Sequence, residues 1–161
     1  SKKNSMSGKK HWRFILNHAG LWLALFAGFV GSASEQTLRL PVFRDKPNNE
    51  AFTSQGRTVF LDKPFQLKGF AVEHYANGTP RHFFADIIVD EQVIRLEVNH
   101  PYSAGWGEDY YLTSYDMHSP EPAYCVVQIV REPLKYVMLA GIIMMLVGGF
   151  LLFLEGCFIV N

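Results

Sequence analysis

Two long apolar runs frame a polar middle region in which apolar residues occur only in short stretches. Residues 14–33 and 136–154 contain no charged side chain. At about 1.5 Å per residue, about 20 residues are enough to cross roughly 30 Å of hydrocarbon. The pattern therefore predicts two transmembrane helices. The predicted boundaries divide the chain into a flank, a helix, a middle domain, a second helix and a tail, at residues 1–13, 14–33, 34–133, 134–154 and 155–161.

A cleavable signal peptide is the alternative interpretation of the first run. Basic residues precede it and Gly31-Ser32-Ala33-Ser34 follows it, as at a cleavage site. The run is longer than the apolar core of about 7–15 residues that such peptides have. The second run is apolar on every side, which the core of a small soluble protein could not cover. Both runs are therefore interpreted as membrane-spanning.

The charges on either side of the first run predict the orientation. Five lysines and arginines precede it, whereas residues 34–133 carry nine basic against fourteen acidic residues, a net charge of −5. Short basic flanks stay in the cytoplasm, so both termini should be cytoplasmic and the middle domain extracytoplasmic. Arg131 and Lys135 lie on the unexpected side, but a long domain crosses largely regardless of its charge.

The middle region has the pattern of short strands joined by turns. Apolar stretches alternate there with Gly, Pro, Asn and Asp, and Ile94, Leu96 and Val98 alternate with charged residues as in a sheet with one solvated face. Strands are predicted at residues 37–43, 58–61, 65–75, 81–89, 93–99, 110–115 and 124–130. The fold class is thus a membrane protein whose two helices flank an all-β domain, an antiparallel sandwich or an open barrel.

Turn residues give the order of the strands in one part of this domain. Asn77-Gly78 is suited to a type I′ hairpin, which needs a positive φ at both positions. Asn77-Gly78-Thr79 also matches a glycosylation acceptor, although the turn explains the same residues. Asp90-Glu91 separates the next two strands, so residues 65–99 should form a three-stranded meander.

Little in the middle domain suggests chemistry. Its four histidines and fourteen acidic residues show no metal-site or catalytic-triad spacing, and the balanced total charge argues against nucleic-acid binding. Cys125 and Cys157 are predicted on opposite sides of the membrane, so no disulfide is expected. His100 is a weak candidate site residue, because Pro101 holds it extended at a strand end. A structural role in closing that loop is the stronger interpretation.

His18 stands out, because it lies about one helical turn inside the first membrane run. An ionisable group inside a span indicates a site, and a neutral imidazole is a common ligand of haem iron. The alternative is a histidine close enough to the interface to remain hydrated. Leu21, Trp22 and Leu25 share its helical face and would form an apolar wall. Small residues on another face, and glycines in the second run, are spaced for close contact with neighbouring helices and imply a larger bundle.

Four stretches of the sequence resemble the ResB/CcsB family of cytochrome c biogenesis proteins, in its compact form. They are Leu16-Asn17-His18-Ala19-Gly20-Leu21-Trp22-Leu23, Val98-Asn99-His100-Pro101, Thr113-Ser114-Tyr115-Asp116 and Gln128-Ile129-Val130-Arg131-Glu132-Pro133. The resemblance runs from about Phe14 to Phe153. No one stretch is specific, and the similarity rests on their order and on the helix–domain–helix arrangement.

The resemblance implies a subunit of a system II cytochrome c synthase, which carries haem across the membrane and presents it to apocytochrome c. It implies His18 as an axial haem ligand, hence as the contact to the haem iron, and Trp22 as a wall beside the haem. The implied partner is a CcsA-type subunit whose tryptophan-rich motif this sequence lacks, so ligation by this chain alone is not expected. Relatives carry further helices and a longer outer domain, so a fragment or a compact relative is expected. The competing function is a membrane-anchored scaffold whose β-domain only binds a partner.

Overall fold

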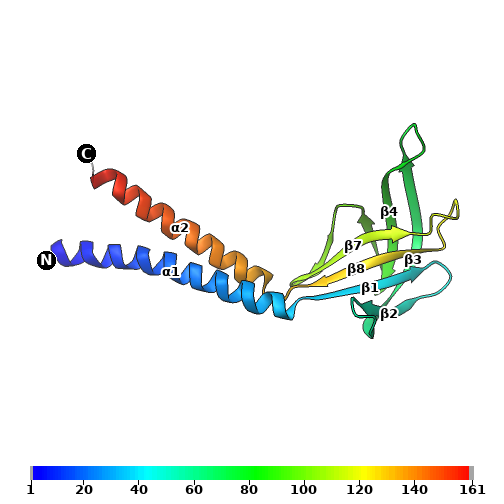
Figure 1. The fold of residues 1–161 in the computed structure, drawn as a ribbon, viewed down its shortest axis with the longest axis horizontal. Coiled ribbons are helices and arrows are strands. Elements are labelled where there is room, and N and C mark those ends of the chain that lie inside the picture. Colours follow the sequence, from blue (N-terminus) through cyan, green and yellow to red (C-terminus); the bar gives the residue numbers. More distant parts are fainter. Residues whose placement is uncertain (1, 160–161) are drawn as a thin grey trace. The chain divides into compact units, whose positions relative to one another are not determined.

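The computed structural model describes residues 2–159 and, within that range, the side chains of residues 11–154. The chain divides into two compact units. One contains helix α1 (Lys2–Ser34) and helix α2 (Lys135–Ile159), and the other is a β-domain that spans Glu35–Arg131 (Figure 1).

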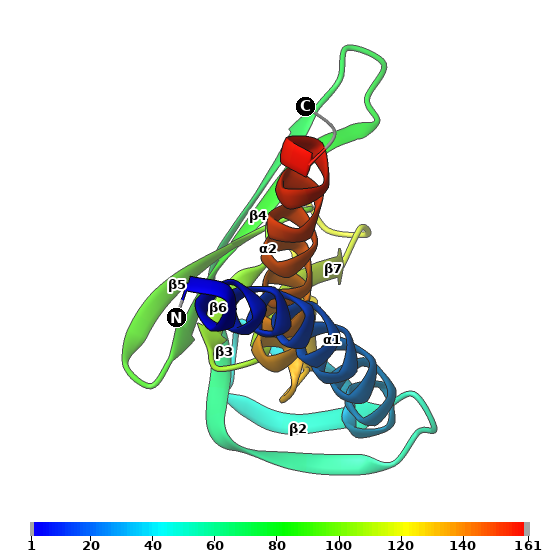
Figure 2. The ribbon, with the colours of Figure 1, turned by 90° about the vertical axis from the view of Figure 1, so that its left-hand side faces the viewer.

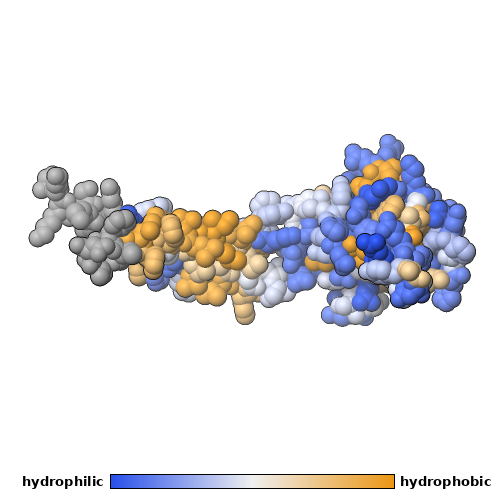
Figure 3. All heavy atoms as spheres, turned by 90° about the horizontal axis from the view of Figure 1, so that it is seen from above, coloured by the Kyte–Doolittle hydropathy of each residue, from blue (hydrophilic) through white to orange (hydrophobic). Residues whose placement is uncertain are grey.

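Both helices contain a segment long and apolar enough to cross a membrane. These segments are His11–Ser34, with 24 residues, and Lys135–Leu154, with 20 residues. Apolar side chains cover much of the visible surface of the two helices, whereas polar residues dominate that of the β-domain (Figure 3). Helix α1 begins well before residue 14, because the basic flank continues the helix.

The β-domain is one antiparallel sheet of eight strands, in the order β5-β4-β3-β2-β1-β8-β7-β6. The strands are β1 (Gln36–Phe43), β2 (Asn48–Thr53), β3 (Thr58–His74), β4 (Pro80–Val89), β5 (Gln92–Glu97), β6 (Tyr102–Gly105), β7 (Glu108–Tyr115) and β8 (Tyr124–Arg131). Figures 1 and 2 show how strongly this sheet coils. Strand β5 comes close to β7, yet the sheet does not close. The predicted fold class is confirmed, in its open-barrel form.

One face of the coiled sheet forms the core. Leu38, Leu40 and Val42 are buried at alternate positions of β1, and their partners in β8 are Ile129, Val127 and Cys125. Burying one such aliphatic side chain contributes about 1.5–3 kcal/mol. The alternation that predicted a sheet with one solvated face therefore also positions the core.

Strand β3 is longer than predicted, and two strands were missed. Residues 58–61 and 65–75, predicted as separate strands, belong to one strand of 17 residues that pairs with β2 and then with β4. Pro64 lies where the register with β2 shifts, a position at which a missing N–H is tolerated. The missed strand β2 begins with Asn-Asn, and the missed strand β6 contains Ser-Ala-Gly. These residues rarely favour strands.

The type I′ geometry occurs at a different turn from the one predicted. Asp90 and Glu91 both have positive φ, 53° and 63°, so the β4–β5 turn is the one with this geometry. At the β3–β4 turn only Gly78 has a positive φ, 81°. There the Tyr75 N–H donates to the Thr79 carbonyl and the Gly78 N–H donates to the Tyr75 carbonyl. The hairpin at Asn77-Gly78 exists, but its type was predicted wrongly.

Candidate functional site

The two helices run antiparallel (Figure 1) and pack against each other through glycine. A Cβ atom on Gly20 would overlap the Met145 nitrogen, and one on Gly141 would lie 2.6 Å from the Ala24 nitrogen. A Cβ on Gly148 would lie 2.6 Å from the Asn17 nitrogen. Real Cβ atoms do not approach so closely, so the backbones meet at a distance that only glycine permits. Close approach through small residues is the usual basis of helix association in membranes.

Asn17 adds a polar contact to this interface. Its side-chain amide donates a hydrogen bond of 2.8 Å to the backbone carbonyl of Met145. Gly149 lies beside the same amide, since a Cβ there would be 3.3 Å from Asn17 Nδ2. Gly148 thus admits the backbone of Asn17 and Gly149 leaves room for its side chain. This contact fixes which face of α1 is turned towards α2.

The small-residue strips found in the sequence therefore face each other. Ala27 is buried and Gly28 faces Met138 of the second helix. Because each strip covers the other, the strips do not by themselves require a further helix, and the larger bundle stays a prediction. Gly20, whose added Cβ would come closest to the second helix, was not among the residues of the predicted strip.

His18 lies on a different face of α1 and is exposed. Its Nδ1 is 3.0 Å from the Phe14 carbonyl oxygen. The centroids of the His18 and Phe14 rings lie 3.8 Å apart. A carbonyl oxygen can only accept, so Nδ1 carries the hydrogen. In the neutral imidazole the lone pair then resides on Nε2. This is the arrangement of metal-binding histidines, whose second nitrogen donates to a carbonyl or carboxylate.

The face around His18 is aromatic and apolar. Trp22, one turn further along, is 75% exposed, and Phe29, on the same face, is 83% exposed. Leu21 and Leu25, expected on the wall beside His18, are exposed as well. Neither ring of this face is covered by the second helix, so a flat apolar surface adjoins the imidazole.

His100 has local partners in the β-domain. Its backbone N–H donates to the Glu97 carbonyl at 3.2 Å, and its Nδ1 lies 3.3 Å from the Val98 carbonyl oxygen. Asn99, between them, has a φ of 64°. These contacts hold His100 in the loop that follows β5, and its role stays a prediction.

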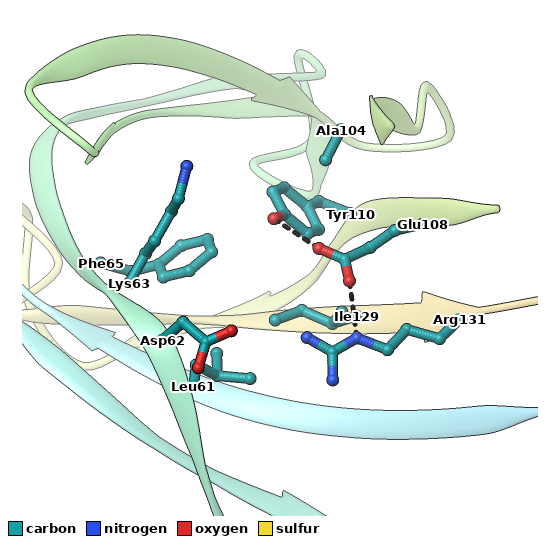
Figure 4. A pocket seen from close by; sticks show the side chains of 9 residues that line it. All are labelled: Leu61, Asp62, Lys63, Phe65, Ala104, Glu108, Tyr110, Ile129 and Arg131. Carbon is teal, nitrogen blue, oxygen red and sulfur yellow. Dashed lines mark hydrogen bonds and ion pairs between the residues drawn. The ribbon is translucent and has the colours of Figure 1, made fainter. Parts of the chain in front are cut away.

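A charged network lines a cavity of about 220 Å³ in the β-domain (Figure 4). The Arg131 guanidinium donates to one Glu108 oxygen at 2.6 Å, and the Tyr110 hydroxyl donates to the other at 2.8 Å. Burial, and then the adjacent Glu108 carboxylate, raise the pKa of Tyr110, so its hydroxyl remains a donor. On the β3 side, Asp62 and Lys63 line the cavity, and the Lys63 ammonium donates to Asp90 Oδ2 at 2.6 Å. The contacts of Glu108 tie β7 to β8.

Sequence reasoning missed this network because 23 positions separate Glu108 from Arg131. Arg131 was interpreted only as a charge at the return to the membrane. Within the residues that the structure describes, no cluster of three or more His, Cys, Asp and Glu side chains is placed to hold a metal ion.

A protein-family model matches the sequence of this chain. The model of the ResB-like family covers residues 7–124. The chain belongs to the ResB-like family. The match includes α1 from residue 7 onwards, with His18, and the β-domain up to β7. It ends at the first residue of β8. With this family, the two apolar helices identify a membrane protein.

A solved structure shares the fold. The structure titled "Cytochrome c Heme Lyase CcmF" aligns with a TM-score of 0.56 at 11% identity, over 88% of this chain. The chain spans 24% of the length of that protein. No curated protein matches the sequence.

Proposed function

We propose that this chain is a haem-handling membrane subunit of a system II cytochrome c synthase. It helps to carry haem across the membrane and present it to apocytochrome c. Membership of the ResB-like family supports a role in cytochrome c biogenesis, as does the fold shared with a cytochrome c haem lyase. The system II assignment comes from the sequence resemblance.

The observation that carries the proposal is the tautomer of the His18 imidazole, that is, which of its two nitrogens carries the proton. The Phe14 carbonyl holds the proton on Nδ1, which leaves the Nε2 lone pair for iron. A porphyrin supplies four of the iron's ligands, so one protein nitrogen beside an apolar surface is enough to hold it. Trp22 supplies a flat side chain one turn away. The residues on this face therefore fit a haem bound through His18.

The remaining parts of the proposal concern partners and sidedness. The three tryptophans of the chain, Trp12, Trp22 and Trp106, are far apart in the sequence, so a CcsA-type partner is expected to supply the tryptophan-rich haem-handling motif. The exposed face of α1 is the natural contact for that subunit and for lipid. The basic flank of α1 and the acidic β-domain favour a bacterial inner membrane with the β-domain on the outer side. Covalent attachment of haem is assigned to the complex.

Replacement of His18 tests the ligand. The His18→Ala variant should lose most of the haem absorbance of the purified protein and stall cytochrome c maturation, while the β-domain stays folded. Imidazole added to the sample should partly restore the haem band, because it replaces the missing nitrogen. His11→Ala is the matched control. It removes an imidazole two turns earlier on the same face of α1, about 10 Å away, and should change neither readout.

The opposite result would favour the scaffold function. An observation compatible with that alternative is the sheet edge at β6, where all four residues are exposed. A scaffold would lose partner binding after changes in β6 and would keep full activity after His18→Ala. Equal haem content and equal cytochrome c output at equal expression would exclude His18 as the ligand.

A further inference from the structure

One end of the β-domain is held near the membrane by the course of the chain. The first span ends at Ser34 and β1 begins at Gln36. Strand β8 ends at Arg131 and the second span begins at Lys135. An extended chain covers at most about 3.6 Å per residue, so Gln36 lies within about 7 Å of one span and Arg131 within about 14 Å of the other. Because these two residues are paired, they mark the end of the sheet that lies nearest the membrane.

The tip of the β6–β7 hairpin extends past this end of the sheet. Glu108, the first residue of β7, is the strand partner of Arg131, and their side chains form an ion pair of 2.6 Å. Gly105 pairs with Glu108, which leaves Trp106 and Gly107 as the tip. Strands β7 and β8 are antiparallel, so the tip lies beyond Arg131, in the direction in which the chain continues to α2. At about 3.3 Å per residue, its backbone alone extends about 3 Å beyond the sheet.

The tip carries a large exposed ring. Trp106 is 71% exposed. A Cβ added to Gly105 would meet no atom within 4 Å, so the hairpin stands clear of its surroundings at this point. Gly107 has a φ of 65°, a conformation that glycine adopts without strain and that closes the turn directly after the ring. Two glycines thus flank a tryptophan at the corner of a projecting turn.

The interface of a bilayer is the environment that suits this ring. Tryptophan and tyrosine collect at the level of the lipid headgroups, because an apolar ring and a polar N–H or O–H are both satisfied there. Tyr136, in the first turn of α2, occupies such a position at the start of the second span. The interface is about 5–8 Å thick on each side of the hydrocarbon, about the length of the link from Ser34 to Gln36. A tip that extends beyond Gln36 and Arg131 can therefore enter it.

The rest of this end of the domain is polar. The β2–β3 turn borders a groove of about 380 Å³, whose lining includes Gln36 and therefore lies at the same end of the sheet. Hydroxyl, amide and guanidinium groups of Ser54, Gln55 and Arg57 also line it. Such groups match the hydrogen-bonding atoms of lipid headgroups and would be left without partners among acyl chains. One apolar ring beside a polar surface is the pattern expected where a domain rests on headgroups.

We propose that the tip of the β6–β7 hairpin is a membrane anchor, in which Trp106 inserts into the headgroup layer of the bilayer that the two helices span. The anchor holds one end of the β-domain on the lipid surface and restricts its rotation about the two links to the helices. Only the tip enters the lipid, whereas β6, whose four residues are exposed, stays in water. The inserted group is neutral, so the anchor needs no anionic lipid and is not screened by salt. It does not depend on haem.

The test uses the full chain without haem, reconstituted into phosphatidylcholine vesicles. In the double variant Trp12→Phe, Trp22→Phe, the only tryptophan is Trp106, so the fluorescence reports its surroundings alone. The emission should be shifted to the blue and should resist quenching by iodide. It should lose most of its intensity when the acyl chains are brominated next to the headgroup. The same result is expected at low and at high salt.

The matched control moves the tryptophan to the β3–β4 turn. Strand β3 begins beside the polar groove and continues for 17 residues, so this turn lies at its other end. Adding Trp106→Phe and Tyr75→Trp to the double variant places the only tryptophan there, at a position that is 55% exposed. Its emission should be that of a ring in water, quenched by iodide and unaffected by brominated lipid.

Other outcomes would overturn the anchor. Quenching of Trp106 by iodide and not by brominated lipid would place the ring in water. A blue-shifted emission that brominated lipid does not quench would show that protein covers the ring, as in contact with a second copy of the chain. Equal quenching of both tryptophans by brominated lipid would mean that the domain lies on the membrane without a specific anchor, and a loss of quenching at high salt would assign the attachment to charge. Circular dichroism verifies that each variant keeps its strands.

Discussion

Gly148→Ala should separate the two helices. The new Cβ would lie 2.6 Å from the nitrogen, 2.7 Å from the Cα and 2.8 Å from the Cβ of Asn17. Carbon atoms in contact prefer about 3.5–4.0 Å, so the backbones must move apart by about 1 Å. Two of these atoms belong to the helix backbone and the Cβ is bonded directly to it, so none of them can rotate away. The displacement would lengthen the Asn17–Met145 hydrogen bond, now 2.8 Å, beyond bonding distance.

The expected cost follows from three contributions. Overpacking costs about 1–3 kcal/mol. Loss of a hydrogen bond between membrane helices costs about 0.6–2 kcal/mol. Replacing glycine by alanine in a helix returns about 1 kcal/mol. The variant should therefore be less stable by about 2 kcal/mol, the middle of the resulting range.

Gly28→Ala is the matched control, because it has the same propensity gain and lies in the same interface. Its Cβ would meet only Met138 Sδ at 3.8 Å, an ordinary contact. We expect it to be neutral or slightly stabilising. Unfolding by sodium dodecyl sulfate in mixed micelles, followed by circular dichroism, measures both variants. Equal stability of Gly148→Ala and the wild type, or equal losses in the two variants, would refute the packing argument.

Three further predictions concern charge, thiols and sidedness. The Arg95 side chain donates a hydrogen bond to Asp86, which lowers the pKa of that carboxyl. The stabilisation from this pair is therefore fully present above the usual pKa range of aspartate and is lost as the pH falls through the lowered pKa. In urea unfolding, Asp86→Asn should weaken this dependence of stability on acid pH. Burial raises the pKa of Cys125 to about 12, so a maleimide at pH 8 should label it only after denaturation, and gel mobility should be identical with and without reductant because no bond to Cys157 forms. Protease added outside spheroplasts should cut the loop at residues 101–107 and leave an amino-terminal tag intact; a cut tag would reverse the orientation.

The fold class could be predicted because its signals are local. Uncharged runs of membrane length define the helices, and alternation such as that of Ile94 and Leu96 defines strands. The sequence signals failed where the conformational preference of single residues disagrees with the pairing of their strand in the sheet. Strand β2 pairs on both sides despite its Asn-Asn start, and β3 continues through Pro64 because its neighbours change there. Only the assembled sheet contains that information.

The candidate site, too, has one part that could be predicted from the sequence and one part that could not. His18 could be found from one sequence position, since an imidazole within an uncharged run is unusual wherever the helix packs. Its orientation could not, because the hydrogen bond of Asn17 to Met145 connects residues 128 positions apart.

The pairing of β1 with β8 makes the β-domain a replaceable module. These strands follow α1 and precede α2, and their outermost residues, Gln36 and Arg131, are directly paired. Paired residues in antiparallel strands have Cα atoms about 4.5–5.5 Å apart, a gap that one short turn can bridge. The domain is therefore an insertion into a helical hairpin. Evolution can enlarge, shrink or exchange it without altering the sequence of either helix, and an engineer can do the same.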